Sequence, residues 1–382
     1  MALPSTLLCL VSEQRMQNAI PLFQTGLHFD QVVLVASKDN GVTNPRFARI
    51  AQDLECAFGE RARWILWNHP VDPMDPGSTA GVCTQIIDAF GGPDCVTVNF
   101  TGGTKPMSIG AYQAGLAGGA PLLYVDTQKE QLYLYQRGAP HSEPFHLEPM
   151  TVGQILAAHG KAVNANWTLT RQPSAVERSI TEQIYTQRPG SLLQALSMQN
   201  LLRRQALDAN QEKQIDQAAV EPAAWLAGWL QQAGEARIEN DQIKISHCMA
   251  RYLDGAWLEQ YVGLALESDG RFADVAGNLQ LAGIENELDV ACTLNGKLAI
   301  VECKSGKMEK GEGAAVISRL RTLKESLAGT FGKSFLVNCY YTHQLSSRFV
   351  ERAAEYVSRM ICLEDLAEVE NIIYNEIAMR RR

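Results

Sequence analysis

Residues 286–307 read NELDVACTLNGKLAIVECKSGK, two largely apolar runs on either side of Asn295-Gly296. Asn-Gly is the strongest two-residue signal for a β-hairpin, because both central residues of its turn need a positive φ. A two-residue loop places Ala291 opposite Ile300 on the neighbouring strand. The stretch therefore predicts an antiparallel hairpin with one buried face.

Charged side chains interrupt the far end of this hairpin. The same register places Asp289 opposite Glu302 and Glu287 opposite Lys304, all on one face. The opposite face is apolar and must be buried; it carries Leu288, Val290, Cys292, Ala299, Val301 and Cys303. Two carboxylates this close repel each other unless they share a proton or a cation.

A divalent cation would resolve that repulsion, since carboxylate oxygens and waters suit Mg²⁺ or Mn²⁺. A lysine beside the ion can orient or deprotonate a water, or neutralise charge on a phosphoryl group. The pattern therefore predicts metal-assisted phosphodiester hydrolysis by Asp289, Glu302 and Lys304. The alternative is a solvated strand end with an ion pair between Glu287 and Lys304.

The elements around the hairpin predict a C-terminal domain, residues 246–382, with a mixed sheet flanked by helices. The expected order is helix, three strands, helix, strand, helix and strand. The expected ranges are 250–268 for the first helix, 272–281, 286–294 and 297–304 for the three strands, then 313–328, 334–340, 346–360 and 361–364.

The first 145 residues alternate differently. Buried strands are predicted at 6–12, 31–37, 63–68, 95–100 and 121–126, separated by helical periodicity, and 129–136 pairs with the last strand as a hairpin. Such alternation predicts a Rossmann-like, doubly wound parallel sheet. Residues 146–245 read as a helical connector that includes a short hairpin at 235–246. The fold class is therefore α/β throughout.

Residues 99–107, NFTGGTKPM, follow the fourth strand and open a helix. The two glycines let the backbone approach a ligand closely. The threonines, the lysine and the helix N-terminus offer donors and charge to an anion. Neither the Walker pattern nor the dinucleotide glycine pattern is present, so the alternative is a tight strand–helix turn. Ser12 and Gln14, at the end of the first strand, could contact the same ligand.

The hairpin motif resembles the PD-(D/E)xK, or restriction-endonuclease-like, superfamily through Asp289 and Glu302-Cys303-Lys304. Members of this superfamily often add an acid from the helix before the sheet, and Glu259 stands at that place. The resemblance therefore implies a third catalytic and metal-binding carboxylate, while the alternative for Glu259 is a solvated helix position.

With the TGGTKPM loop added, the chain resembles the CARF-domain CRISPR ancillary nucleases. This resemblance implies a homodimer whose first domains bind a cyclic oligoadenylate, with the tetra-adenylate used by similar members. It implies a metal-dependent nuclease that cuts single-stranded RNA or DNA, or nicks DNA that can be supercoiled. The implied ligand contacts are Ser12, Gln14, Asn99, Thr101, Gly102, Gly103, Thr104 and Lys105.

Composition agrees with a protein of the cytoplasm. The 382 residues carry a net charge of −8, so contacts to nucleic acid must come from local basic patches. Candidates near the hairpin are Lys307, Lys310, Arg319, Arg321 and Lys324. The 9 cysteines lack regular spacing and are expected to be buried free thiols. No stretch has the length and hydropathy of a membrane span.

Two other functions fit the same sequence. The chain could be a nucleotide-sensing DNA-binding regulator without cleavage, in which residues 220–246 form a winged helix. It could also be a repair or restriction nuclease that needs no ligand, with residues 101–105 serving as a turn only.

Overall fold

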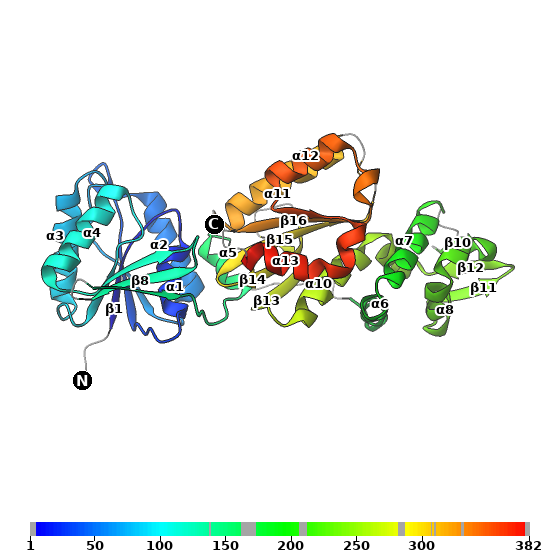
Figure 1. The fold of residues 1–382 in the computed structure, drawn as a ribbon, viewed down its shortest axis with the longest axis horizontal. Coiled ribbons are helices and arrows are strands. Elements are labelled where there is room, and N and C mark those ends of the chain that lie inside the picture. Colours follow the sequence, from blue (N-terminus) through cyan, green and yellow to red (C-terminus); the bar gives the residue numbers. More distant parts are fainter. Residues whose placement is uncertain are drawn as a thin grey trace.

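The computed structural model describes residues 5–136, 139–161, 173–205, 212–281, 287–306, 308, 311–329 and 332–378. These residues form sheets of seven, five and three strands, besides a two-stranded hairpin. Figure 1 shows an elongated molecule with the seven-stranded sheet at one end, the five-stranded sheet in the middle and the three-stranded sheet at the other end. The predicted α/β fold class is confirmed.

The seven-stranded sheet has the order β5-β2-β1-β6-β7-β8-β9, and its first five strands run parallel. These strands are β1 (Thr6–Leu10), β2 (Gln31–Val35), β5 (Arg63–Leu66), β6 (Val96–Asn99), β7 (Leu122–Asp126), β8 (Gln131–Gln136) and β9 (Ala139–Pro144). β1 and β2 are buried along their whole length, which explains their unbroken apolar sequences. The order reverses between β1 and β6, so ligands are expected at the carboxyl ends of these strands.

Two pairs of helices cover this sheet. α1 and α2 lie on one face and α3 and α4 on the other (Figure 1). Their bounds are α1 (Met16–Phe23), α2 (Pro45–Phe58), α3 (Pro76–Ala89) and α4 (Lys105–Gly118), and a small hairpin, β3 (Lys38–Asp39) and β4 (Val42–Thr43), precedes α2. Asn44, Asp75 and Thr104 cap the last three helices, each with a proline in the first turn.

The five-stranded sheet has the order β13-β14-β15-β16-β17, antiparallel up to β15 and parallel beyond it. Its strands are β13 (Asp274–Gln280), β14 (Glu287–Leu294), β15 (Lys297–Lys304), β16 (Lys333–Asn338) and β17 (Arg359–Ile361). Helices α10 and α13 pack on one face, and α11 and α12 on the other (Figure 1). Their bounds are α10 (Trp257–Asp269), α11 (Glu312–Leu327), α12 (Ser347–Tyr356) and α13 (Val369–Ala378), with short turns η3 (Thr342–Gln344) and η4 (Leu363–Glu368).

The predicted element order of this part is confirmed, and α13 is an addition that the sequence reading did not include. Asn286, where the second predicted strand begins, lies outside the described residues.

Most of the region predicted as a connector, from residue 173 onward, does not lie between the two larger sheets. Its helices share a buried cluster with α10, at the end of the molecule away from the seven-stranded sheet (Figure 1). Its elements are α6 (Ala175–Thr186), α7 (Gly190–Arg203), β10 (Lys213–Asp216), η1 (Gln217–Ala223), α8 (Ala224–Gln232), β11 (Ala236–Glu239) and β12 (Gln242–Ile245). The predicted C-terminal domain then begins with α9 (His247–Arg251) and η2 (Tyr252–Ala256), which precede α10. The predicted hairpin is confirmed as β11–β12, and β10 adds a strand that the sequence reading missed.

The first part of the predicted connector does join the two larger sheets, through a short helix, α5 (Val152–Ala158). Its Thr151–Gln154 capping box starts it after β9. Val152, Ile155 and Leu156 bury their side chains in one apolar cluster that includes residues of α2 and of β14 and β15. α5 therefore fastens the N-terminal sheet to the C-terminal one.

Two expectations from composition have different outcomes. Among the described residues, no helix combines the length and the hydropathy that crossing a membrane would need. The cysteines are free, as expected, but Cys56 and Cys248 are exposed rather than buried. Both stand on the solvent side of a helix, and the spacing of the cysteines along the chain does not predict this exposure.

Candidate functional site

The hairpin of β14 and β15 has the predicted turn and register. Asn295 and Gly296 adopt φ of 49° and 69°, and the ladder runs from Leu294 opposite Lys297 to Val290 opposite Val301. The predicted pairing of Asp289 with Glu302 is replaced by a different contact, because the ladder ends one residue earlier. Asp289 turns its carboxylate inward, and Oδ2 accepts a hydrogen bond of 2.7 Å from the N–H of Cys303.

Two cations meet the carboxylate of Glu302. Lys304 Nζ lies 2.7 Å from Glu302 Oε1 and 3.9 Å from Asp289 Oδ2, so it bridges the two acids. Arg319, on α11, also donates to Glu302 Oε1. Glu302 is 2% exposed, so this carboxylate is almost fully removed from water. The sequence correctly grouped Asp289, Glu302 and Lys304, and it missed that Arg319 completes the set.

The environment of Asp289 differs from that of an exposed acid. Burial raises the pKa of Asp289 above the usual aspartate value, while Lys304, the N–H of Cys303 and Arg319 act in the opposite direction. Desolvation is the largest of these effects, since a carboxylate loses hydration when it is buried. A cation brought to this position would favour the ionised form, so the site is suited to a positively charged ligand.

Glu259 does not join this group. It stands in the first turn of α10, and α10 packs on the face of the sheet that carries Val301 and Cys303. Glu302 and Lys304 belong to the opposite face, because side chains alternate along a strand. Glu259 acts on the buried Cys303, whose thiol pKa is raised by burial and further by the carboxylates of Asp289 and Glu259. Glu259 and Asp289 thus both lie close to Cys303, and the predicted catalytic and metal-binding role of Glu259 stays a prediction.

The donors that remain fit a hard divalent cation. Within the described part of the chain, no three His, Cys, Asp or Glu side chains gather closely enough to form a metal site. Asp289 and Glu302 both supply carboxylate oxygens to Lys304, which bridges them. Mg²⁺ is commonly held by one or two carboxylates, with waters and substrate phosphates completing its shell. The two acids therefore fit Mg²⁺ or Mn²⁺ as a two-carboxylate site.

Helix α7 holds the strand end that follows Lys304. The carbonyl of Ser305 accepts hydrogen bonds from Gln199 Nε2 at 3.0 Å and from Arg203 at 3.4 Å. The Arg203 guanidinium also pairs with the carboxylate of Asp254 at 2.5 Å, just before α10. Nothing in the sequence pattern relates these residues, because Arg203 and Ser305 are 102 positions apart in the chain.

The remaining basic candidates have varied surroundings. Lys307 and Lys310 lie outside the described residues. Arg321 pairs with Glu325 one helical turn away and lies over the ring of Tyr356, which is typical of a solvated helix face. Of the other candidates, Arg319 is paired with Glu302 and Lys324 lines a cavity of about 450 Å³.

The glycine loop borders a cavity of about 350 Å³ at the carboxyl ends of β1 and β6. Of the predicted contacts, the following line it: Ser12, Gln14, Thr101, Gly102, Gly103 and Thr104. Ser37, from the end of β2, and Phe47, from α2, line it as well and were not predicted. The signal that could have found Ser37 is its place directly after the second buried strand.

Both glycines are required by close approach of the chain. A Cβ on Gly102 would lie 2.3 Å from the carbonyl oxygen of Leu10. Gly103 has φ of +73°, and a Cβ there would lie 3.1 Å from Met107 and 3.2 Å from Leu10. The loop therefore packs against the end of β1 with its backbone rather than with side chains.

Asn99 and Lys105 are not part of the cavity wall. Asn99 is fully buried; its Oδ1 accepts from the N–H and the hydroxyl of Thr101, and its Nδ2 donates to the carbonyl of Gln17 at 3.0 Å. Lys105 is exposed at the start of α4. The amide of Asn99 holds the loop onto α1, and the predicted ligand contact by Asn99 stays a prediction.

The threonine hydroxyls of the loop are also engaged. Thr101 Oγ1 accepts from the N–H of Val125 on β7 at 2.7 Å, and Thr104 caps α4 by accepting from Met107. An anion in the cavity would therefore meet backbone N–H groups and Ser12 rather than these hydroxyls.

Comparison with protein families gives a match for the C-terminal part of the chain. Residues 246–380 match the family model described as "Card1-like, endonuclease domain". This part of the chain is therefore similar to a Card1-like endonuclease domain. Asp289, Glu302, Lys304 and Arg319 all lie in it, on β14, β15 and α11. A comparison with curated protein sequences gives no match.

Solved structures share the fold over a much larger part of the chain. Protein VC1899 from Vibrio cholerae superposes with a TM-score of 0.80 at 17% identity, covering 99% of each chain. Can2 from Sulfobacillus thermosulfidooxidans, in complex with cyclic tetra-adenylate, gives 0.69 at 20% identity over 98% of each chain. A type III CRISPR defence DNA nuclease activated by cyclic oligoadenylate gives 0.53 at 20% identity, over 88% of this chain and 46% of the other.

These findings confirm the predicted resemblance to the CARF-domain CRISPR ancillary nucleases. In this chain the Card1-like endonuclease domain follows an N-terminal doubly wound sheet that carries the glycine-loop cavity. The endonuclease domain contacts the N-terminal sheet through α5 and contacts α7 through Ser305.

Proposed function

We propose that this chain is a metal-dependent endonuclease that a cyclic oligoadenylate activates by binding in the glycine-loop cavity. The observation that carries the proposal is the cluster of Asp289, Glu302 and Lys304 at the end of the hairpin in a Card1-like endonuclease domain. The shared fold with Can2, whose structure contains cyclic tetra-adenylate, supports this ligand class over nearly the whole chain.

Asp289 and Glu302 would hold the Mg²⁺ or Mn²⁺ ion. When bound, the ion would supply positive charge to an attacking water and to the scissile phosphodiester. Lys304 Nζ, 2.7 Å from Glu302, can orient that water or neutralise the phosphoryl oxygens as charge develops. Arg319 and Lys304 place positive charge beside the buried carboxylate of Glu302, which offsets part of the cost of burying it.

We also propose that the active form is a homodimer. Ile109, Tyr112 and Leu116 are 50%, 36% and 55% exposed, and their spacing puts them on one side of α4. This apolar stripe starts one turn after the glycine loop, where the second half of a symmetric ligand site would be needed. We expect Leu116→Asp to convert a dimer to a monomer in multi-angle light scattering, with ligand binding lost in the same variant.

The reading as a DNA-binding regulator finds less support. The hairpin of β11 and β12 carries Arg237, whose guanidinium is paired with Glu212 and Glu239, and Lys244 is paired with Glu239 too. A wing whose cations are neutralised in this way offers little attraction to a phosphate backbone.

The test is a cleavage assay on single-stranded RNA, single-stranded DNA and supercoiled plasmid. Each substrate is incubated with Mg²⁺ or Mn²⁺, with and without a panel of cyclic oligoadenylates. We expect cleavage that needs the metal and increases with one ring size. Equal cleavage with and without every ligand would leave a ligand-independent nuclease and reject the activation.

A further inference from the structure

A buried ion pair joins the N-terminal sheet to the turn of the catalytic hairpin. Glu130, at the start of β8, receives hydrogen bonds from Lys297 Nζ and from Asn295 Nδ2, the latter at 3.3 Å. The side chains of Lys297 and Glu130 are 11% and 6% exposed. Their separation along the chain is 167 residues, so this is a long-range tertiary contact.

The pair is unusual in the backbone of Glu130 and in the burial of both charges. Glu130 adopts a positive φ of 53°, a conformation that side-chain-bearing residues seldom occupy. Removing two charges from water is costly, and apolar residues of similar volume usually serve stability as well or better. A contact that combines this backbone conformation with this burial contributes position more than stability.

On one side, the contact reaches the catalytic groups through a single strand. Lys297 is the first residue of β15, and Glu302 and Lys304 stand near the end of the same strand. β15 is paired with β14 from Lys297 to Val301 and with β16 from Ala299 to Lys304, so every residue of the strand has a bonded neighbour. A strand bonded on both edges moves as a unit, so the position of Lys297 is passed on to the carboxylates.

On the other side, the contact reaches the glycine loop. Thr101 Oγ1 holds the N–H of Val125 at 2.7 Å, and β7 continues from there to Asp126. Asp126 Oδ1 accepts from Gln128 and Lys129, at 3.1 and 2.9 Å, and so fixes the turn that ends at Glu130. Hydrogen bonds therefore run from the loop to the ion pair within one strand and one turn.

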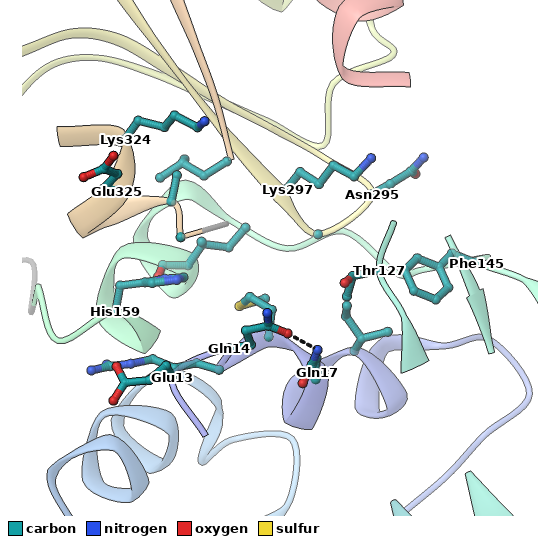
Figure 2. Close-up of a pocket in the computed structure, with 18 residues that line it drawn as sticks. Glu13, Gln14, Gln17, Thr127, Phe145, His159, Asn295, Lys297, Lys324 and Glu325 are labelled. Atoms are coloured by element: carbon teal, nitrogen blue, oxygen red, sulfur yellow. Dashed lines mark hydrogen bonds between the residues drawn. The ribbon is translucent and has the colours of Figure 1, made fainter. Parts of the chain in front are cut away.

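A cavity of about 450 Å³ lies beneath this contact. Figure 2 shows Gln14, Gln17 and Thr127 on one side of it and Asn295 and Lys297 on the other. Gln14 and Gln17 also line the glycine-loop cavity, so the two spaces share a wall. Ile155 of α5 lines the same cavity, so the space lies between the N-terminal sheet and the hairpin turn.

We propose that Glu130 is a positioning residue: through Lys297 and Asn295 it sets the place of the catalytic hairpin according to the state of the glycine loop. The proposal rests on the activation by cyclic oligoadenylate proposed above. It assigns to Glu130 no contact with ligand, metal or substrate, and Glu130 lines neither cavity.

The test compares wild type, Glu130→Gln, the double variant Glu130→Met/Lys297→Met, and Lys129→Met as a control. Lys129 stands in the same turn with its side chain 66% exposed. Calorimetry measures the Kd for cyclic tetra-adenylate, and a fluorescent single-stranded reporter measures cleavage with and without that ligand. The stimulation ratio is the readout, because a merely structural contact would change stability without separating binding from cleavage.

We expect Glu130→Gln and the double variant to bind the ligand within about twofold of wild type and to lose about tenfold or more of the stimulation. The apolar pair is expected to keep the melting temperature, since packed methionines can replace a buried ion pair. Wild-type stimulation in the double variant would overturn the proposal, as would parallel loss of Kd and stimulation. A wild-type enzyme that the ligand does not stimulate would instead reject the proposed activation itself.

Discussion

Glu302→Gln removes one charge from the catalytic cluster while keeping its volume, and its cost can be worked out from the contacts. Truncating one partner of a fully buried ion pair costs about 3–5 kcal/mol, because the other charge is left buried. Here the two partners, Lys304 and Arg319, are 32% and 34% exposed and can regain water. We therefore expect a loss of about 1–2 kcal/mol in the free energy of unfolding.

The catalytic effect should be much larger than the effect on stability. A metal ligand contributes several kcal/mol to the transition state, and about 4 kcal/mol corresponds to about 10³-fold in rate. The assay follows ligand-stimulated cleavage in Mg²⁺ and Mn²⁺ beside a thermal melt. Glu351→Gln, an exposed position on α12, serves as the control and should change neither. A folded Glu302→Gln protein that cleaves within about tenfold of wild type would refute the assignment of Glu302 as a metal ligand.

Three further predictions follow from other contacts. Gly102→Ala should destabilise the protein by about 1–3 kcal/mol and abolish ligand binding in calorimetry, because its Cβ would meet a backbone carbonyl at 2.3 Å. The control is Gly81→Ala, on α3 with open space around it, which should stabilise the protein by about 1 kcal/mol. Arg203→Met should lower kcat about tenfold and leave KM and ligand affinity unchanged, since it releases the strand end beyond Lys304, and a lowered KM would contradict this. Burial lowers the pKa of His159, so below about pH 6.5 the unfolded chain binds a proton that the folded chain does not, and stability is lost as the pH falls. In urea titrations at pH 7 and 5.5, His159→Gln should therefore show a smaller loss of stability than wild type. An equal loss in both proteins would contradict this prediction.

The hairpin could be predicted because local chemistry determines it. Asn295 and Gly296 fix the turn, and the period of two then fixes which side chains share a face. The prediction stopped being accurate where tertiary contacts took over. Asp289 leaves the ladder because its carboxylate finds the N–H of Cys303, and no spacing rule contains that choice.

The sequence could not predict which residues of other helices lie beside the catalytic hairpin. Glu259 has the right spacing before the sheet, but the face on which a helix packs depends on the apolar side chains of the whole sheet. Arg319 and Arg203 look like ordinary helix cations until the fold brings them to Glu302 and Ser305. A polar residue at the end of a strand predicts a ligand contact whether its side chain faces a ligand or, as with buried Asn99, holds a neighbouring loop in place.

Strand β15 combines these observations. Its middle is apolar and bonded on both edges, while each end carries a buried or half-buried ion pair, Glu130 with Lys297 at one and Glu302 with Lys304 at the other. Neither pair is an efficient source of stability, since desolvation offsets much of the attraction. What both pairs provide is position: one ties the strand to the N-terminal sheet, and the other keeps two carboxylates within reach of one cation. A rigid strand with such ends is suited to converting a change beside the glycine loop into a change at the catalytic acids.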